Sequence, residues 1–167
     1  EGQFGISITG LLDDPFWVDL SGPWPITIDG DQVTINMNQF PVALYVIDGA
    51  EAGLPIPALS IAVTGVGDQP IQGTFDGTTI SAEGIGLRVR IYFAKVTLET
   101  LSSQVPPGDF IVTDITLTTP EEMTEEGELT LHLEKTLSAT PSGNGLIDGT
   151  LGGKQIIADM PGVLKLP

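Results

Sequence analysis

The pattern that decides the fold is clearest in residues 87–93, which read LRVRIYF. Apolar side chains at positions 87, 89, 91 and 93 alternate with two arginines and a tyrosine, so one face of the segment is apolar and the other polar. A period of two residues is typical of a half-buried β-strand, because successive side chains of an extended chain point to opposite faces. We therefore predict a strand across this segment.

The same alternation recurs along the whole chain, as in residues 6–9 (ISIT), 26–28 (ITI), 33–35 (VTI) and 129–134 (LTLHLE). Clusters of glycine and proline separate these segments, for example at residues 21–23, 106–108 and 141–143. The spacing predicts an all-β chain of about eleven strands. We expect a single antiparallel β-sandwich or flattened β-barrel that occupies residues 1–167 as one domain.

Helix signals are scarce, and we expect at most one short helix, near Thr119–Glu126. Its sequence supplies an N-cap threonine, a proline at the first helical position and a glutamate three residues after the cap.

Two apolar segments, VALYVI at 42–47 and LPIPALSIAV at 54–63, do not alternate cleanly. Two interpretations are open for them: strands that are buried on both faces, or the lining of a cavity for an apolar ligand.

An internal repeat relates residues 73–84 (GTFDGTTISAEG) to residues 149–160 (GTLGGKQIIADM). Five positions are identical at an offset of 76 residues, and a fainter third copy spans residues 28–33. Each copy is predicted to be a hairpin with a tight turn. Duplication of a hairpin unit and convergence on common turn chemistry explain the similarity about equally well.

The composition excludes several classes of protein. The chain has 22 acidic residues against 6 basic ones and a net charge of −16, so we expect no nucleic-acid binding. It has no cysteine, which excludes a disulfide scaffold and thiolate metal sites. A hydrophobic content of 41% nevertheless allows a folded core. No apolar run is long enough to span a bilayer as a helix.

Acidic, Thr- and Gly-rich surfaces of this kind are typical of exported proteins. We therefore expect a secreted, periplasmic or cell-surface location, with any export signal already removed ahead of Glu1.

Two groups of residues are candidates for ligand binding. The aromatic segment around Trp17 and Trp24 is either an exposed platform for a sugar or a protein partner, or a buried plug in the core, and we favour the plug. Arg88, Arg90 and Tyr92 share the polar face of one strand. The arginines could bind an anionic ligand or a partner's carboxylate, although we expect them to pair with the chain's own acids.

Among metals, the composition favours calcium, because the chain is rich in carboxylate oxygens and has one imidazole and no thiol. The candidate ligands are Asp13, Asp14, Asp29, Asp31 and the acidic run Glu121–Glu128. The alternative is that the Asp-Gly sequences only form good hairpin turns and that the glutamates form a solvated face. The single histidine, His132, is predicted to lie on the outward face of a strand beside Thr130 and Glu134, in a structural role.

These observations favour a non-catalytic binding or assembly module of the cell envelope or extracellular space. The chain lacks a nucleophile motif, a phosphate-binding loop and a thiolate metal cluster. Its expected partner is a protein or a small apolar ligand. Two alternatives stay open: a β-barrel carrier of a lipid or another hydrophobic molecule, and an acidic hydrolase that uses paired carboxylates.

Overall fold

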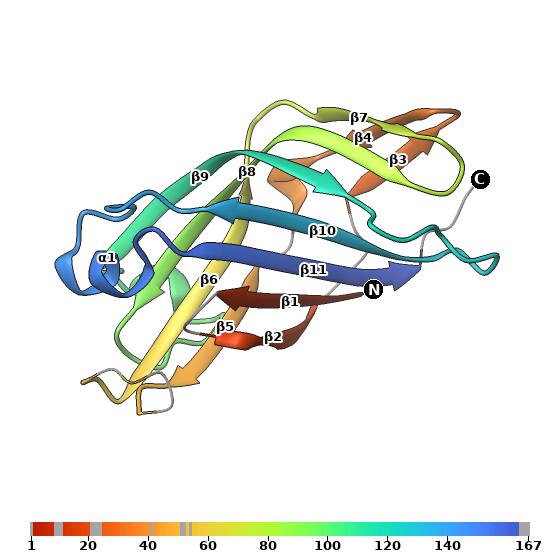
Figure 1. The fold of residues 1–167 in the computed structure, drawn as a ribbon. Coiled ribbons are helices and arrows are strands. Elements are labelled where there is room, and N and C mark those ends of the chain that lie inside the picture. Colours follow the sequence, from red (N-terminus) through yellow and green to blue (C-terminus); the bar gives the residue numbers. More distant parts are fainter. Residues whose placement is uncertain are drawn as a thin grey trace.

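The computed structural model of the chain describes residues 2–8, 12–20, 25–40, 42–50, 53 and 55–163. These residues form an eleven-stranded antiparallel sheet with one α-helix and two short 3-10 helices (Figure 1), so the predicted all-β fold is confirmed. The strands are β1 (Gly2–Ile8), β2 (Leu12–Leu20), β3 (Ile26–Asp29), β4 (Gln32–Ile35), β5 (Ala43–Asp48), β6 (Ala58–Val66), β7 (Ile71–Phe75), β8 (Ile80–Tyr92), β9 (Gly108–Thr118), β10 (Glu128–Thr136) and β11 (Gln155–Val163). The helices are η1 (Met37–Gln39), η2 (Leu101–Ser103) and α1 (Gly145–Leu151).

The order of the strands is β2-β1-β11-β10-β9-β8-β7-β4-β3, and β6 and β5 form a branch beside β8. The branch arises because β8 is 13 residues long and changes its partner: its first residues pair with β7, and its last ones pair with β6. Register shifts on either side of Ile85 interrupt the pairing of β8 with β9. Gly84 and Asp114 adopt positive φ angles of 80° and 57° at this point, as expected for β-bulges that bend a strand.

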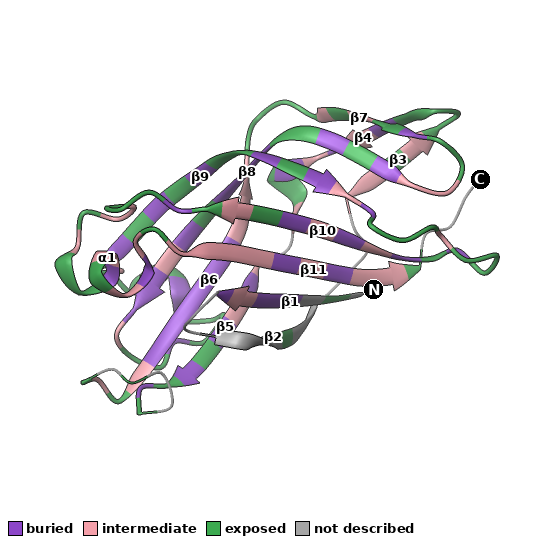
Figure 2. Ribbon diagram, in the orientation of Figure 1, coloured by how far each residue is buried: buried purple, intermediate pink, exposed green. Residues whose placement is uncertain are grey.

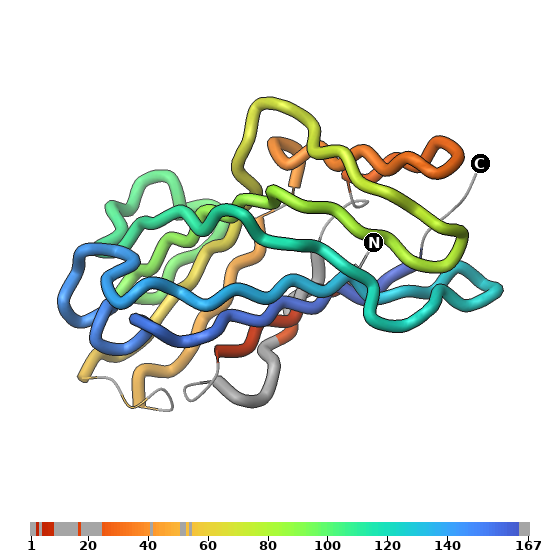
Figure 3. The backbone as a smooth tube through the Cα atoms, turned by 45° about the horizontal axis from the view of Figure 1, so that its top comes forward, coloured from red at the N-terminus to blue at the C-terminus, as the bar shows by residue number. Residues whose placement is uncertain are grey.

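The sheet curls into a half-barrel, and the curl can be followed in Figure 3. Strands β2 and β5, which belong to different arms of the sheet, lie next to each other across the curl. Buried residues alternate with exposed ones along most strands, as Figure 2 shows. The buried set faces inward and forms the main core, whose largest fully buried side chains include Tyr45, Ile85, Ile91, Leu131 and Met160.

The non-alternating segment at 58–63 is explained by a second, smaller cluster on the other face of the sheet. Ala62 packs there against Tyr92, Val96 and Leu101, beneath the connection between β8 and β9. The hydroxyl of the fully buried Ser60 fastens this connection, because it donates to the carbonyl of Ala94 (2.6 Å) and accepts from the N–H of Val96 (3.1 Å). Strand β6 is therefore buried on both faces, as one of the two interpretations held.

The short helix lies at Gly145–Leu151 and not near Thr119–Glu126 as expected. The side chain of Thr119 accepts from the N–H of Ile80 (2.8 Å), and its own N–H donates to the Ile80 carbonyl (3.1 Å). Thr119 therefore pairs with a strand across the sheet and does not cap a helix. Asn144 caps α1 instead, because its side chain accepts from the N–H groups of Leu146 and Ile147.

The two copies of the internal repeat have different structures. Residues 73–84 form the predicted hairpin between β7 and β8, and residues 28–33 form the hairpin between β3 and β4. Residues 149–160 instead contain the end of α1, a turn and the first part of β11. The second copy follows the Asn144 cap, which places its first three residues in a helix, so it is not a hairpin.

Candidate binding surface on the outer face

Four strands bring a row of functional side chains together on the outer face of the half-barrel. Along the order β10-β11-β1-β2, His132 lies opposite Asp159, Asp159 opposite Gly5, and Gly5 opposite Trp17. Directly opposed residues of antiparallel strands place their side chains on the same face. The neighbours Leu131, Leu133, Ala158 and Met160 are buried in the core, so this row faces outward. We call these four residues the outer-face row.

Trp17 forms the aromatic end of the row. Its indole covers Gly5 so closely that a Cβ atom added there would lie 2.7–2.8 Å from three atoms of the six-membered ring. The tryptophan is nevertheless 46% exposed, because one side of the indole lies against the sheet and the rest faces solvent. The interpretation of Trp17 as a buried core plug is therefore wrong. Glycine is required at position 5 because no larger residue would leave space for the ring.

His132 forms the polar end of the row. In its protonated form the imidazole donates from Nδ1 to Asp159 (2.6 Å) and from Nε2 to Glu134 (3.1 Å). Partial burial lowers the pKa of His132, but its hydrogen bonds to the two carboxylates and their charges raise it more, so the net shift is upward. Glu134 also accepts from the side-chain amide of Gln155. The prediction that His132 faces outward beside Glu134 is confirmed, while its contact with Asp159 was not foreseen.

A groove of about 630 Å³ lies beside the row, at the end of the sheet where β10 begins. Thr130, which is two residues before His132 on β10, is part of its wall. The other lining residues come from β1, β11, the first residues of β10 and the connection between β9 and β10: Gln3, Pro120, Glu121, Glu122, Thr124, Glu128, Leu129, Pro161, Gly162 and Val163. The groove therefore adds acidic and amide groups to the same outer surface.

Arg88, Arg90 and Tyr92 lie on the outer face of β8, outside the row. Arg88 forms a bidentate ion pair with Asp109, from Nε (2.9 Å) and Nη2 (2.5 Å), and this pair holds the pKa of Asp109 below its usual value. Arg90 is half-buried, and its Nε has no hydrogen-bond partner. Tyr92 is buried, and its hydroxyl donates to the carbonyl of Leu101 (3.4 Å), so its ring is not presented to a ligand.

The proposed calcium ligands are only partly described. Asp29 and Asp31 lie on either side of Gly30 in the exposed turn between β3 and β4. The side chains of Asp13 and Asp14, and the whole of Trp24, lie outside the described residues. Within the described part of the chain, no group of three or more His, Asp or Glu side chains is arranged to hold a metal ion. Calcium binding stays a prediction.

No protein-family model, curated protein or solved structure matches this chain. Among the described residues, no helix is both long enough and apolar enough to cross a membrane.

Proposed function

We propose that the chain is a non-catalytic binding module of the cell envelope or extracellular space, and that it binds carbohydrate on the outer-face row. The observation that carries the proposal is the exposed indole of Trp17, which lies flat over Gly5 beside the hydrogen-bonded Asp159 and His132. An open aromatic face can stack on the apolar face of a sugar ring. Carboxylates and an imidazole at its edge are suitable partners for the sugar hydroxyls.

The acidic composition supports an exported location and also favours a neutral sugar as ligand. The row itself holds one carboxylate, and Glu134 and the glutamates of the groove lie around it. An anionic polysaccharide would be repelled by these groups and by the net charge of −16. A neutral hexose polymer meets no such repulsion.

Packing in the core argues against the carrier of a hydrophobic ligand. Two pockets are lined mainly by apolar core residues, one beneath β1, β6 and β8–β11 and the other beside α1, and their volumes are about 20 and 10 Å³. Each is large enough for about one water molecule and far too small for a lipid chain. In the segments that suggested a cavity lining, residues 43–47 belong to β5 and residues 58–63 to β6, and their buried side chains are part of the packed clusters.

For the hydrolase alternative, a general acid would need a carboxyl group with a raised pKa. Asp76 and Asp109 are shifted in the opposite direction. The pKa of Asp76 is lowered by hydrogen bonds from the Thr79 hydroxyl and from the N–H groups of Thr78 and Thr79. These two carboxylates stabilise a turn and an ion pair, and neither is suited to act as a general acid.

The proposal is tested by titrating the protein with soluble neutral glucans, mannans and xylans while following tryptophan fluorescence, and by co-sedimentation with their insoluble forms. We expect at least one neutral polysaccharide to change the emission and to bind. Replacing Trp17 by Ala should weaken binding at least tenfold, because stacking is lost. Leu98→Ala, which trims another exposed apolar side chain (62% exposed), serves as the control and should bind normally.

Two results would contradict the carbohydrate proposal: no neutral polysaccharide in the panel binds, or the Trp17→Ala variant binds as well as the native protein. In the first case a protein becomes the better candidate partner for the row.

A further inference from the structure

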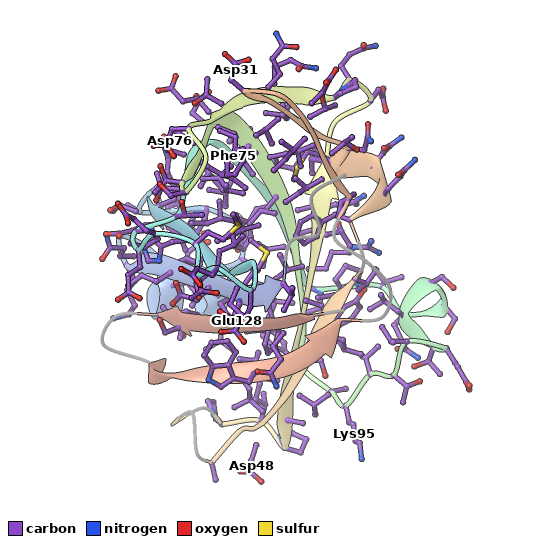
Figure 4. All side chains as sticks on the ribbon, turned by 90° about the vertical axis from the view of Figure 1, so that its right-hand side faces the viewer. Asp31, Asp48, Phe75, Asp76, Lys95 and Glu128 are labelled. Atoms are coloured by element: carbon purple, nitrogen blue, oxygen red, sulfur yellow. The ribbon has the colours of Figure 1, made fainter. Side chains whose placement is uncertain are left out.

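Charge is distributed unevenly along the half-barrel. The turn between β3 and β4, the turn between β7 and β8 and the connection between β9 and β10 all lie at one end of the sheet, on the right in Figure 1. Figure 4, viewed towards that end, labels Asp31, Asp76 and Glu128, one residue from each of these segments. Together the three segments and the strand ends next to them carry eight acids and no lysine or arginine: Asp29, Asp31, Asp76, Glu121, Glu122, Glu125, Glu126 and Glu128.

The basic residues of the described part lie towards the opposite end. Arg88 and Arg90 are in the last third of β8, and Lys95 follows that strand. Lys135 is close to the end of β10, and Lys154 immediately precedes β11, both on the side of α1. The described bases therefore lie away from the acidic end, and the end that carries them also holds acids such as Glu99, Asp109 and Asp148.

Arg90 is the unusual member of this basic set. The residue opposite Arg90 on β9 is Asp109, but both oxygens of that carboxylate accept hydrogen bonds from Arg88. Arg90 forms no ion pair with any described residue, and its Nε is the one buried side-chain nitrogen or oxygen of the described part without a hydrogen bond. Arg90 still attracts Asp109 and helps to lower its pKa. Because the half-buried guanidinium of Arg90 forms no direct ion pair with a described carboxylate, it is available to bind a further carboxylate.

The surface around Arg90 has the composition of a small protein interface. Ile111 lies opposite Arg88 on β9 and is 55% exposed, although it is a large apolar residue in the middle of a strand. Arginine beside exposed apolar surface is a common combination at the centre of protein interfaces. We call Arg88, Arg90, Asp109 and Ile111 the arginine patch.

We propose that the arginine patch of one molecule binds the glutamate-rich connection between β9 and β10 of a second copy of the chain. This connection and the first residue of β10 carry the densest run of carboxylates, with Glu121, Glu122, Glu125, Glu126 and Glu128 all exposed. Its backbone is held in place by hydrogen bonds, including one from the Met123 N–H to the Thr78 carbonyl (2.8 Å). An ordered loop presents its carboxylates to a guanidinium with little loss of conformational entropy on binding.

The two complementary surfaces lie at opposite ends of the same molecule, so the contact is head-to-tail. A head-to-tail contact leaves a free patch at one end of each complex and a free loop at the other, and it therefore propagates into chains of molecules. The arginine patch lies on β8 and β9, outside the outer-face row, whereas Glu121 and Glu122 of the connection line the groove beside the row. The association itself does not require a bound carbohydrate. It supplies a mode of assembly for the module proposed above.

Salt should affect this association in both directions. At low ionic strength the net charge of −16 makes two copies repel each other over long distances. At about 0.15 M salt the screening length is about 8 Å, so the local contact between patch and loop outweighs the distant charges. At about 1 M salt the contact itself is screened. We expect association to be strongest at intermediate salt.

The test is sedimentation velocity of the purified chain at concentrations up to about 1 mM, the range for weak association, with EDTA present so that calcium cannot bridge carboxylates. Two half-blocked variants are compared with the native protein: Arg90→Gln, and the double variant Glu121→Gln/Glu122→Gln in the exposed loop. Lys154→Gln is the control for loss of one positive charge away from the patch. Circular dichroism confirms that each variant is folded.

We expect the native chain and Lys154→Gln to form species larger than dimers, and each half-blocked variant to associate at least tenfold more weakly. An equimolar mixture of the two half-blocked variants should give a 1:1 complex that does not grow, because each component keeps one intact surface. The proposal is overturned if the native chain stays monomeric at every salt concentration, if it stops at a symmetric dimer, or if the mixture behaves like the separate variants.

Discussion

Replacing Ser60 by Ala tests whether the connection between β8 and β9 is fastened to the sheet by a single hydroxyl group. Ser60 is fully buried on β6, where its hydroxyl donates to the Ala94 carbonyl (2.6 Å) and accepts from the Val96 N–H (3.1 Å). Removal of the hydroxyl affects the two partners differently. Ala94 is exposed, so its carbonyl can bind water, whereas Val96 is 2% exposed and its N–H is left buried.

The expected loss of stability is the sum of the costs at the two former partners of the hydroxyl. Loss of the hydrogen bond to the exposed carbonyl costs about 0.5–1.5 kcal/mol, and an unsatisfied buried N–H costs about 1–3 kcal/mol. We therefore expect Ser60→Ala to lower the free energy of unfolding by about 2–4 kcal/mol. For a chain of this size each kcal/mol lowers the Tm by about 2–4 °C, which predicts a decrease of about 4–16 °C.

The assay is urea denaturation followed by circular dichroism, with a thermal melt as the second measurement. Ser103→Ala is the matched control, because the Ser103 hydroxyl also donates to a backbone carbonyl, that of Thr100 (2.9 Å), but is exposed. The control should change the free energy of unfolding by less than about 0.5 kcal/mol. If Ser60→Ala is as stable as Ser103→Ala, the second buried cluster is not held together as described here.

Three further changes test other parts of the molecule. Gly5→Ala places a Cβ atom 2.7–2.8 Å from the Trp17 ring, so the indole must move; we expect an altered tryptophan emission and at least tenfold weaker carbohydrate binding in the titration proposed above. His132 has a raised pKa in the folded state, so its ion pairs add stability fully below the unfolded-state pKa of about 6.5, and this contribution is lost as the pH rises through the folded-state value. The free energy of unfolding measured between pH 5 and pH 9 should therefore fall less steeply in His132→Asn than in the native protein, and equal slopes would contradict the assignment. Asn144→Ala removes the cap of α1 and should lower the free energy of unfolding by about 1 kcal/mol in urea denaturation, whereas no change would show that the helix does not need its cap.

Local patterns in the sequence predicted the strands well because each strand has one apolar face. The alternation at 87–93 predicts which side chains of β8 are buried, and the structure places Val89 and Ile91 in the core as expected. The same alternation does not predict that β6 is buried on both faces. Its second buried face is created by the connection after β8, some thirty residues later, and alternation within β6 contains no information about that connection.

The position of the short helix shows where local signals compete with pairing across the sheet. Thr119 and Asn144 are both good N-cap residues, and Thr119 has the additional proline and glutamate expected of a helix start. Thr119 is nevertheless held by two hydrogen bonds to Ile80 on a strand 39 residues away. A sequence pattern of about ten residues contains no information about a hydrogen bond to a distant strand, so it cannot predict that this bond forms in place of a helix cap.

The candidate binding surface could not be predicted from the sequence either, because it also depends on contacts between segments that are distant in the chain. Trp17 and His132 were each singled out, but neither the glycine under the indole nor the carboxylate beside the imidazole could be assigned. The contact of Trp17 with Gly5 depends on the pairing of β1 with β2, and the contact of His132 with Asp159 depends on the pairing of β10 with β11. The two contacts come together in one row only through the pairing of β1 with β11, which joins residues about 150 positions apart. The sequence also does not show that Asp109 forms its bidentate ion pair with Arg88 and not with Arg90. That pairing depends on the register of β8 and β9.

The dependence of the outer-face row on the pairing of β1 with β11 has a physical consequence. Pairing between segments so distant in sequence carries a large loop-closure cost, so it is a slow and late kind of contact in folding. The hairpin of β1 with β2 places Trp17 over Gly5, and the pairing of β1 with β11 brings both residues next to Asp159. A carbohydrate that binds the completed row must therefore also stabilise the junction between the first and last strands. The ligand should slow local opening of β1 more than it slows opening of β8, whose partners on both sides are formed by nearby segments.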